Sequence, residues 1–373
     1  MNILAHKYND SSEVVICQEP LHATQMQILK EKFFMNPAVY GFPFQMSYFL
    51  AVERQMRMAV VENLAKRVIV FERSLLSARH VYMSLQNNSI PKVHQEVYKT
   101  FFEEGEVGYA MPDEIIYLKP DVRKCLLELQ KRNDENSRNM FTEEYLLECH
   151  KLYQEPSMKT DVGFEEVDNR AEDLTVTVDR IDEIIGKAKG VEIEILPKEP
   201  VRPQVVSIEG NVGAGKTSLI RSIQKRLASE DRKDIIILEE PVDEWTKVTD
   251  GCDNIMHSFY KHPNLHAFAF QTLIAFTTMR SMFEATYNHP DAKVILCERS
   301  LFSSAKVFAE ALRDEGAMNE VEMEVYRQMV EEENIQWMNP MKLIYLETSP
   351  EICLERIQAR GREEEGKIDI EWE

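Results

Sequence analysis

A glycine-rich segment between two regular stretches constrains the fold of this 373-residue chain more than any other feature. Residues 205–208 form an apolar run that predicts a strand, and residues 218–227 show the apolar spacing of a helix. Between them GNVGAGKT, residues 210–217, matches the pattern G-x-x-x-x-G-K-[ST]. In such a loop backbone N–H groups turn toward phosphate oxygens, and the helix N-terminus adds partial positive charge. The sequence therefore predicts a nucleoside-triphosphate site in a strand–loop–helix unit.

Two polar side chains close this phosphate loop (residues 210–217). The ammonium of Lys216 would reach the β- and γ-phosphates, and the hydroxyl of Thr217 would bind Mg²⁺. A glycine-rich turn that matches the pattern by chance is the alternative, which the strand and the helix beside the loop disfavour. The residues predicted to bind the phosphates are Gly210, Asn211, Val212, Gly213, Ala214, Gly215, Lys216, Thr217 and Ser218.

The tripeptide Glu-Arg-Ser occurs twice, at residues 72–74 and 298–300, each time after an apolar run. The same separation of 226 residues joins Gln45 to Gln271 (271 − 45) and Arg73 to Arg299 (299 − 73). A constant separation over several landmarks indicates a tandem duplication of one domain-sized unit.

The repeat predicts a first domain at residues 14–189 without a phosphate loop, and a second at residues 204–373 with one. Residues 190–203, which include three prolines, are predicted to be a linker. Strands alternate with helices in both copies, which favours an α/β fold with a parallel sheet flanked by helices. Late in the first copy we predict a helix over residues 142–153, a strand over residues 174–178 and a last helix to about Lys189.

Five segments occur in one order along the second copy: GNVGAGKT, LEEPVDEW, FYKHPNLHAFAFQT, CERSLFSSAKVF and RIQARGREEEG. Together they resemble the deoxyribonucleoside kinases. The resemblance covers nearly all of the second copy and, more weakly, the first. It implies a P-loop kinase fold and ATP-dependent phosphorylation of the 5′-hydroxyl of a deoxyribonucleoside, with Mg²⁺ as cofactor.

Charged residues at two strand ends would serve the reacting groups. Phosphorylation of a hydroxyl needs a carboxylate within hydrogen-bond reach, and Glu240 lies at a strand end where the family has its general base. Arg299 would pair with a phosphate or with Glu240, and Glu298 would bind Mg²⁺. A helix-capping or loop carboxylate at Glu240 and an ordinary surface ion pair at Arg299 are the alternatives.

The nucleoside would be held by aromatic and polar side chains further along the copy. Gln271 offers one donor and one acceptor to a base edge. The resemblance places Trp245, Phe270 and Phe308 against the base, and Tyr260 with Glu365 at the sugar 3′-hydroxyl; ordinary core packing is the alternative for the aromatic residues. The predicted lid, or else a solvated charged helix end, carries Arg356, Arg360 and Arg362.

Two small residues, Thr278 and Ser304, indicate which nucleobase the second copy prefers. Thr278 and Ser304 stand where purine- and cytidine-preferring members of the family carry Arg and Asp, which favours the thymidine-accepting type. Ala305 departs from that type, whose Arg the first copy keeps as Arg79. We expect a pyrimidine deoxynucleoside, thymidine or deoxycytidine.

The first copy keeps the acceptor side of the site and lacks the donor side, so we predict that it is inactive. It also lacks the central strand, for which only residues 2–5 (NILA) are strand-like, and a missing strand leaves a hole in the core. Either the chain is part of a longer tandem protein, which we favour, or the two copies complement each other. The retained residues are Glu19, Gln45, Glu72, Arg73, Ser74 and Glu135, and the lid and aromatic positions hold Leu126, Gln130, Arg132, Phe34 and Thr24.

Composition limits the partners. The formal net charge of -20 disfavours a polymeric nucleic acid. The absence of an apolar run near about 18 residues disfavours a membrane span. Without a signal-peptide pattern we expect a cytoplasmic protein, or a mitochondrial one if the natural N-terminus is longer. A homodimer or a pairing of the two copies is expected. A non-catalytic member of the family, such as a respiratory complex I accessory-type subunit, and another P-loop small-molecule kinase are the competing functions.

Overall fold

The structure is a computed structural model of the chain. It divides into two compact units, Met1–Ile195 and Leu196–Glu373, and each is described by itself. The residues that the structure describes are 2–20, 24–63, 66–86, 88–104, 112–131, 141–158, 162–169, 174–188, 202–331 and 333–362.

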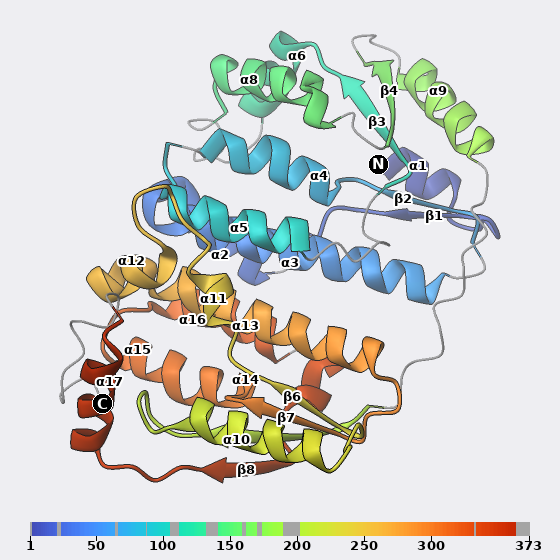
Figure 1. The fold of residues 1–373 in the computed structure, drawn as a ribbon. Coiled ribbons are helices and arrows are strands. Elements are labelled where there is room, and N and C mark those ends of the chain that lie inside the picture. Colours follow the sequence, from blue (N-terminus) through green and yellow to red (C-terminus); the bar gives the residue numbers. More distant parts are fainter. Residues whose placement is uncertain are drawn as a thin grey trace. The chain divides into compact units, whose positions relative to one another are not determined.

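The second unit alternates strands with helices (Figure 1). Its elements are, in chain order, β5 (Gln204–Glu209), α10 (Lys216–Ser229), β6 (Ile235–Leu238), α11 (Val242–Trp245), α12 (Ile255–Lys261), α13 (Pro263–Asn288), β7 (Val294–Glu298), α14 (Leu301–Ser303), the π-helix η4 (Ser304–Ala309), α15 (Glu310–Asp314), α16 (Glu320–Val330), the 3₁₀-helix η5 (Glu333–Met338), β8 (Lys342–Tyr345) and α17 (Pro350–Arg360).

Four strands of the second unit form one parallel sheet in the order β6-β7-β5-β8. The central strands β7 and β5 are apolar, because helices cover both faces of a parallel sheet and bury its side chains. Ile208 and Ile295 in these strands are fully buried. Ile220 of α10 packs against Ile208 and Leu296. Since all four strands run the same way, their carboxyl ends lie along one edge, which is where ligands bind in open α/β sheets. The predicted α/β fold with a parallel sheet is confirmed.

The first unit repeats part of this plan. Its elements are α1 (Asn2–Lys7), β1 (Val14–Cys17), α2 (Thr24–Met35), α3 (Pro37–Glu62), β2 (Val68–Phe71), α4 (Leu75–Ser77), the π-helix η1 (Ala78–Met83), the 3₁₀-helix η2 (Ser84–Gln86), α5 (Lys92–Glu104), β3 (Glu114–Lys119), α6 (Val122–Lys131), α8 (Glu143–Gln154), the 3₁₀-helix η3 (Pro156–Met158), β4 (Gly163–Asp168) and α9 (Leu174–Lys187).

The sheet of the first unit is split in two. Strand β1 pairs with β2, and β3 pairs with β4, both in parallel. By the repeat, β1, β2 and β3 correspond to β6, β7 and β8, and β4 follows them. Within the described residues of this unit no strand takes the place of β5, which in the second unit joins β7 to β8. In this part of the chain the sheet is therefore in two parts, as expected where a central strand is missing.

Two local predictions for the first unit are wrong. Residues 174–178, whose LTVTV alternation predicted a strand, are the start of α9, and the strand β4 lies earlier, at Gly163–Asp168. The helical period prevails because Thr177, Ile181, Ile184 and Ile185 are all buried at helix spacing. The NILA segment belongs to α1, where Leu4 packs against Val14 and Ile181.

Of the other predictions for this part of the chain, one is confirmed and one lies almost wholly outside the described residues. The helix predicted over residues 142–153 is α8, which begins after its N-cap Thr142. The predicted linker, residues 190–203, lies outside the described residues except for Arg202 and Pro203. None of the helices within the described ranges is long and apolar enough to cross a membrane.

Candidate active site

The phosphate loop leaves β5 at Glu209 and enters α10 at Lys216. Gly210, Gly213 and Gly215 have φ angles of 148°, 80° and 100°, a region that favours glycine. A Cβ atom at Gly213 would lie 2.5 Å from the carbonyl oxygen of Cys353 in α17. The loop conformation and the close approach of α17 both depend on glycine at this position.

The side chain of Lys216 folds back over the loop. Its Nζ donates hydrogen bonds to the carbonyl oxygens of Gly210 (3.0 Å) and Asn211 (2.8 Å), and the residue is only 5% exposed. Burial lowers the pKa of Lys216 to about 8, helped by the positive charge of Arg299 and opposed by nearby carboxylates. A desolvated cation at a loop of this geometry is suited to an anionic ligand.

Thr217 and Glu298 bring two oxygens together beside the loop. The Thr217 hydroxyl donates a hydrogen bond of 2.7 Å to Glu298 Oε1. Burial raises the pKa of Glu298, and the negative charge of Glu240 raises it further. A cation next to this carboxylate would stabilise its charged form, and hydroxyl and carboxylate oxygens are ligands that Mg²⁺ accepts.

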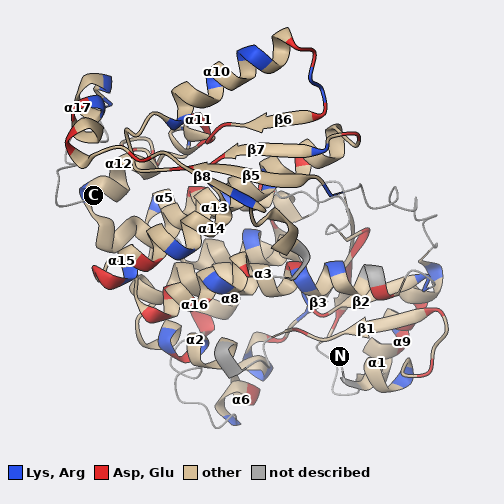
Figure 2. Cartoon of the chain, turned by 90° about the horizontal axis from the view of Figure 1, so that it is seen from below, with Lys and Arg blue, Asp and Glu red and all other residues tan. Residues whose placement is uncertain are grey.

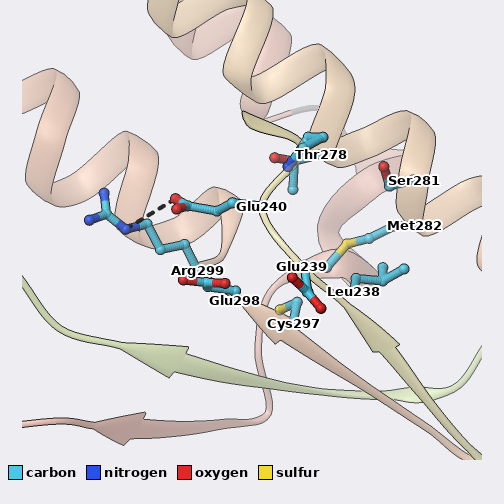
Figure 3. Close-up of a pocket in the computed structure, with 10 residues that line it drawn as sticks. Leu238, Glu239, Glu240, Thr278, Ser281, Met282, Cys297, Glu298 and Arg299 are labelled. Carbon is cyan, nitrogen blue, oxygen red and sulfur yellow. Dashed lines mark ion pairs between the residues drawn. The ribbon is translucent and has the colours of Figure 1, made fainter. Parts of the chain in front are cut away.

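Glu240 and Arg299 face each other at the ends of β6 and β7 (Figure 3). Arg299 Nε lies 3.2 Å from Glu240 Oε1, and the guanidinium lies 4.2 Å from the centre of the Phe308 ring. The neighbouring carboxylate of Glu239 points away from Glu240 and pairs with Arg221, 3.3 Å away. The two adjacent glutamates therefore serve opposite sides of the strand end.

A pocket opens at these strand ends below α13, as Figure 3 shows. Thr278, Ser281 and Met282 of α13 form one of its walls. Ser281 and Met282 were not predicted, and no sequence signal marks them. The remaining lining residues are Leu238, Glu239, Glu240, Pro241, Cys297, Glu298 and Arg299.

Gln271 and the predicted aromatic residues lie in the core around α13. Gln271 is 5% exposed, and its Oε1 has no hydrogen-bond partner among the described residues. Leaving a buried acceptor without a hydrogen-bond partner costs about 1–3 kcal/mol of folding free energy. The unpartnered oxygen of Gln271 is therefore a reason to expect that a ligand bonds to it. The Phe270 ring meets the Trp245 ring edge to face at 5.7 Å. The Trp245 Nε1–H donates to the hydroxyl of Thr277 at 2.9 Å, a contact that the sequence did not reveal.

Helix α17 and its arginines border the phosphate loop. Arg356 donates hydrogen bonds to the carbonyl oxygens of Gly213 (3.3 Å) and Ala214 (2.9 Å). Arg360 ends the helix, and Arg362 follows the glycine cap. Figure 2 shows Lys and Arg in blue along α17 and α10. The structure thus brings one lid arginine to the loop and places the other two at the adjoining helix end.

Both units match the same protein family. The deoxynucleoside kinase family model matches residues 2–193 and again residues 206–372. The chain belongs to the deoxynucleoside kinase family.

Individual deoxynucleoside kinases are similar over about one copy of the repeat. Deoxycytidine kinase 2 of Gallus gallus is 32% identical over 190 residues, which cover 46% of this chain and 70% of that protein. Deoxycytidine kinase of Homo sapiens is 31% identical over 193 residues, or 47% of this chain and 72% of that protein. Mitochondrial thymidine kinase 2 of Homo sapiens is 28% identical over 181 residues, covering 47% and 62%.

Three further predicted site residues of this member of the family have other neighbours than predicted or lie outside the described residues. The Phe308 ring lies against Arg299, and the Tyr260 ring packs on Phe259 at 5.1 Å. Glu365, the predicted partner of Tyr260, lies outside the described residues. Thr348, which no motif predicted, donates a hydrogen bond to the carbonyl oxygen of Ala214 at 3.3 Å.

The first unit keeps the glutamate–arginine pair in a different setting. Arg73 Nε lies 3.5 Å from Glu19 Oε1. The Tyr48 hydroxyl donates to the same Glu19 oxygen at 2.8 Å, and Arg73 donates to the Tyr153 hydroxyl at 3.1 Å. Glu72, the counterpart of Glu298, accepts the backbone N–H of Glu19 at 3.1 Å. Phenols and a backbone N–H therefore bond to these groups, whereas Glu298, the counterpart of Glu72, bonds to Thr217 of the phosphate loop.

The other counterparts of the site residues in the first unit are a buried glutamine, two uncharged residues of a helix and a phenylalanine. Gln45 Oε1, like Gln271 Oε1, is buried without a described hydrogen-bond partner. Leu126 and Gln130 lie on α6 and carry no charge. Phe34 packs beside Phe33, with ring centres 5.5 Å apart. Arg132, Glu135 and the side chain of Thr24 lie outside the described residues.

Proposed function

We propose that the second unit transfers the γ-phosphoryl group of ATP to the 5′-hydroxyl of a deoxyribonucleoside. The observation that carries this proposal is the presence of the phosphate loop and the Glu240–Arg299 pair at one edge of one sheet. Arg299, Glu240 and Glu298 all lie close enough to Lys216 to shift its pKa. Donor-side and acceptor-side groups therefore share one site.

In the proposed reaction Glu240 accepts the proton of the 5′-hydroxyl as its oxygen attacks the γ-phosphorus. The new O–P bond forms while the bond from the γ-phosphorus to the bridging oxygen breaks, and ADP leaves with that electron pair. Arg299 holds Glu240 in place through their ion pair and offers positive charge to the transferring group. Lys216, in the phosphate loop, neutralises the β- and γ-phosphates.

Thr217 and Glu298 are the residues that would hold Mg²⁺. When bound, the ion would neutralise phosphate charge and orient the phosphates. The described residues contain no cluster of three or more His, Cys, Asp or Glu side chains that could hold a metal. This fits Mg²⁺, which takes one or two protein oxygens and completes its shell with phosphate and water.

The lid arginines would act on the same charge. Arg356 is already bonded to the loop backbone, and we propose that Arg356, Arg360 and Arg362 contact phosphate oxygens when ATP is bound. Closure of such a segment also excludes water from the reacting group.

For the nucleoside we propose that Gln271 reads the base edge, because its buried Oε1 lacks a partner. Trp245, Phe270 and Phe308 would bound the base, and Tyr260 with Glu365 would bind the sugar. A pyrimidine is favoured because Thr278 in the pocket wall is uncharged and its hydroxyl is already bonded to the Ile274 carbonyl at 2.8 Å. The buried Ser304 likewise offers no charge to a base.

A coupled assay with ATP, Mg²⁺ and each of the four deoxynucleosides tests the proposal. We expect turnover with thymidine or deoxycytidine at a higher kcat/KM than with the purines, and loss of turnover in Lys216→Ala. A folded, ATP-binding preparation without turnover on any of the four would contradict the activity. A purine preference would contradict only the specificity.

For the first unit we propose a non-catalytic role within the same chain. The supporting observation is that Tyr48 and Tyr153 occupy the hydrogen-bonding groups of Glu19 and Arg73. An isolated first unit that phosphorylates a deoxynucleoside would contradict this role.

A further inference from the structure

The backbone at Arg299 adopts an unusual conformation. Within the described residues only Asp231 and Arg299 have a positive φ without being glycine, and the φ of Arg299 is 61°. This left-handed region is sterically unfavourable for a residue with a Cβ atom. Such a conformation persists only where surrounding contacts hold it. We call residues 298–300 the Arg299 turn.

Two hydrogen bonds join the Arg299 turn to the end of β5. The backbone N–H of Arg299 donates to the carbonyl oxygen of Ile208 at 3.1 Å. The Ser300 hydroxyl donates to Glu209 Oε1 at 2.6 Å, and both residues are buried, at 1% and 6% exposed. The same hydroxyl accepts the backbone N–H of Ser303 at 3.2 Å as the N-cap of α14. Its donor and its acceptor functions are both used.

The first unit contains the same tripeptide, and its described residues include no counterpart of β5. Ser74 caps α4 as Ser300 caps α14, and its hydroxyl accepts the Ser77 N–H at the same 3.2 Å. Among the described residues no carboxylate bonds to the Ser74 hydroxyl, and Arg73 does not have a positive φ. The left-handed backbone therefore does not follow from the sequence Glu-Arg-Ser or from its cap. It accompanies the contacts with β5.

Glu209 also connects the turn to the donor side of the site. It directly precedes Gly210, the first residue of the phosphate loop, and its carbonyl oxygen accepts the N–H of Leu346 at 2.8 Å. Its carboxylate takes no part in the proton or phosphoryl transfer proposed above, although its charge helps to raise the pKa of Lys216. Burying a carboxylate costs folding free energy unless the carboxylate is hydrogen-bonded. The hydrogen bond from Ser300 meets this requirement for Glu209.

We propose that Glu209 is a positioning residue: its hydrogen bond from Ser300 fixes the Arg299 turn and thereby places the Arg299 guanidinium beside Glu240. The proposal rests on the proposed kinase activity of the second unit. Glu209 touches neither reacting atom, so it acts through Ser300 and Arg299. Glu209 directly precedes the phosphate loop, and through Ser300 and Arg299 it is linked to Glu240. It therefore couples the side of the site that binds ATP to the side that binds the nucleoside.

The test compares kcat and KM in full-length Ser300→Ala, Glu209→Ala and the double variant. We expect each single variant to lower kcat by about tenfold to hundredfold, the effect of losing one hydrogen bond to a buried charge. We expect the KM for ATP to change by no more than about threefold, and the double variant to be no more than about threefold worse than either single one, since both remove one interaction. Glu209→Gln, which keeps an acceptor oxygen, should recover most of the activity.

Ser74→Ala is the matched control, because it removes the same helix cap in the first unit without touching a carboxylate. We expect its kcat to stay within about twofold of the wild type, while its loss of thermal stability resembles that of Ser300→Ala. The positioning role is wrong if Lys216→Ala is inactive and yet Ser300→Ala and Glu209→Ala turn over like the wild type. It is also wrong if Glu209→Gln is no better than Glu209→Ala. If Lys216→Ala retains turnover, the proposed activity itself fails.

Discussion

Gly213 shows how one residue fixes the phosphate loop. Its φ of 80° and the carbonyl oxygen 2.5 Å from a built Cβ are separate reasons for glycine. We expect Gly213→Ala to lower the free energy of unfolding by about 1–2 kcal/mol for the backbone and about 1–3 kcal/mol for the clash. We also expect ATP binding to be lost. Differential scanning calorimetry and isothermal titration calorimetry would measure the two effects.

Gly316 provides the control for Gly213, because its φ is 75° and no atom beyond its own chain neighbours lies within 4 Å of an added Cβ. Gly316→Ala should show only the backbone penalty and bind ATP normally. Equal destabilisation of the two variants, with ATP binding intact in both, would contradict the role given to the contact with Cys353.

Lys216 gives the site a pH dependence. Burial first, and then the charge of Arg299, lower its pKa to about 8 in the free protein. Phosphate favours the charged ammonium, so above this pKa binding must first protonate the amine. We expect ATP affinity to fall by up to about tenfold per pH unit as the pH rises above about 8. Calorimetric titrations with ATP at a series of pH values would show this.

Lys216→Arg keeps its charge over the same range, and its ATP affinity should therefore stay flat. A wild-type profile as flat as that of Lys216→Arg would show that burial does not lower the pKa of Lys216.

At the scale of elements, α9 is a helix because its buried side chains recur at helical spacing. Ile181 is 7% exposed and packs in one cluster with Leu4 and Val14, whereas Val176 is 64% exposed. We expect Ile181→Ala to lower the free energy of unfolding of the first unit by about 2–4 kcal/mol, since it leaves a cavity. Chemical denaturation followed by circular dichroism would measure the loss.

Val176→Ala is the control, and it should change stability by no more than about 0.5 kcal/mol because the side chain is exposed. If Val176→Ala were the more damaging variant, residues 174–178 would have to be buried in the manner of a strand, as their alternation suggested.

The sequence predicted the structure correctly where neighbouring residues alone determine the backbone conformation. The phosphate loop lies between its strand and helix as predicted, because each glycine answers a local backbone requirement. The strand at residues 174–178 was mispredicted, because LTVTV satisfies the period of two as well as a helical face. The contacts of Glu209 with Ser300 and of Trp245 with Thr277 were not predictable, since each joins residues far apart in the chain.

At the scale of the whole molecule, the chain contains two deoxynucleoside kinase units with different sheets. In the second unit β5 carries the phosphate loop and contacts the Arg299 turn. Among the described residues of the first unit no strand takes its place, the sheet is in two parts, and the hydroxyls of Tyr48 and Tyr153 bond to the glutamate and the arginine of the pair. One strand thus distinguishes the unit that we expect to be catalytic from the one that we do not.

The most direct test of this account compares Glu240→Gln with Glu19→Gln in the full chain, using the steady-state kcat for the preferred deoxynucleoside. The two glutamates are equivalent in the repeat, and each pairs with its own arginine. We predict that Glu240→Gln lowers kcat by about 10²–10⁴-fold, as expected for loss of a general base, while Glu19→Gln leaves it unchanged. Equal losses in the two variants, or a loss only in Glu19→Gln, would contradict the assignment of catalysis to the second unit.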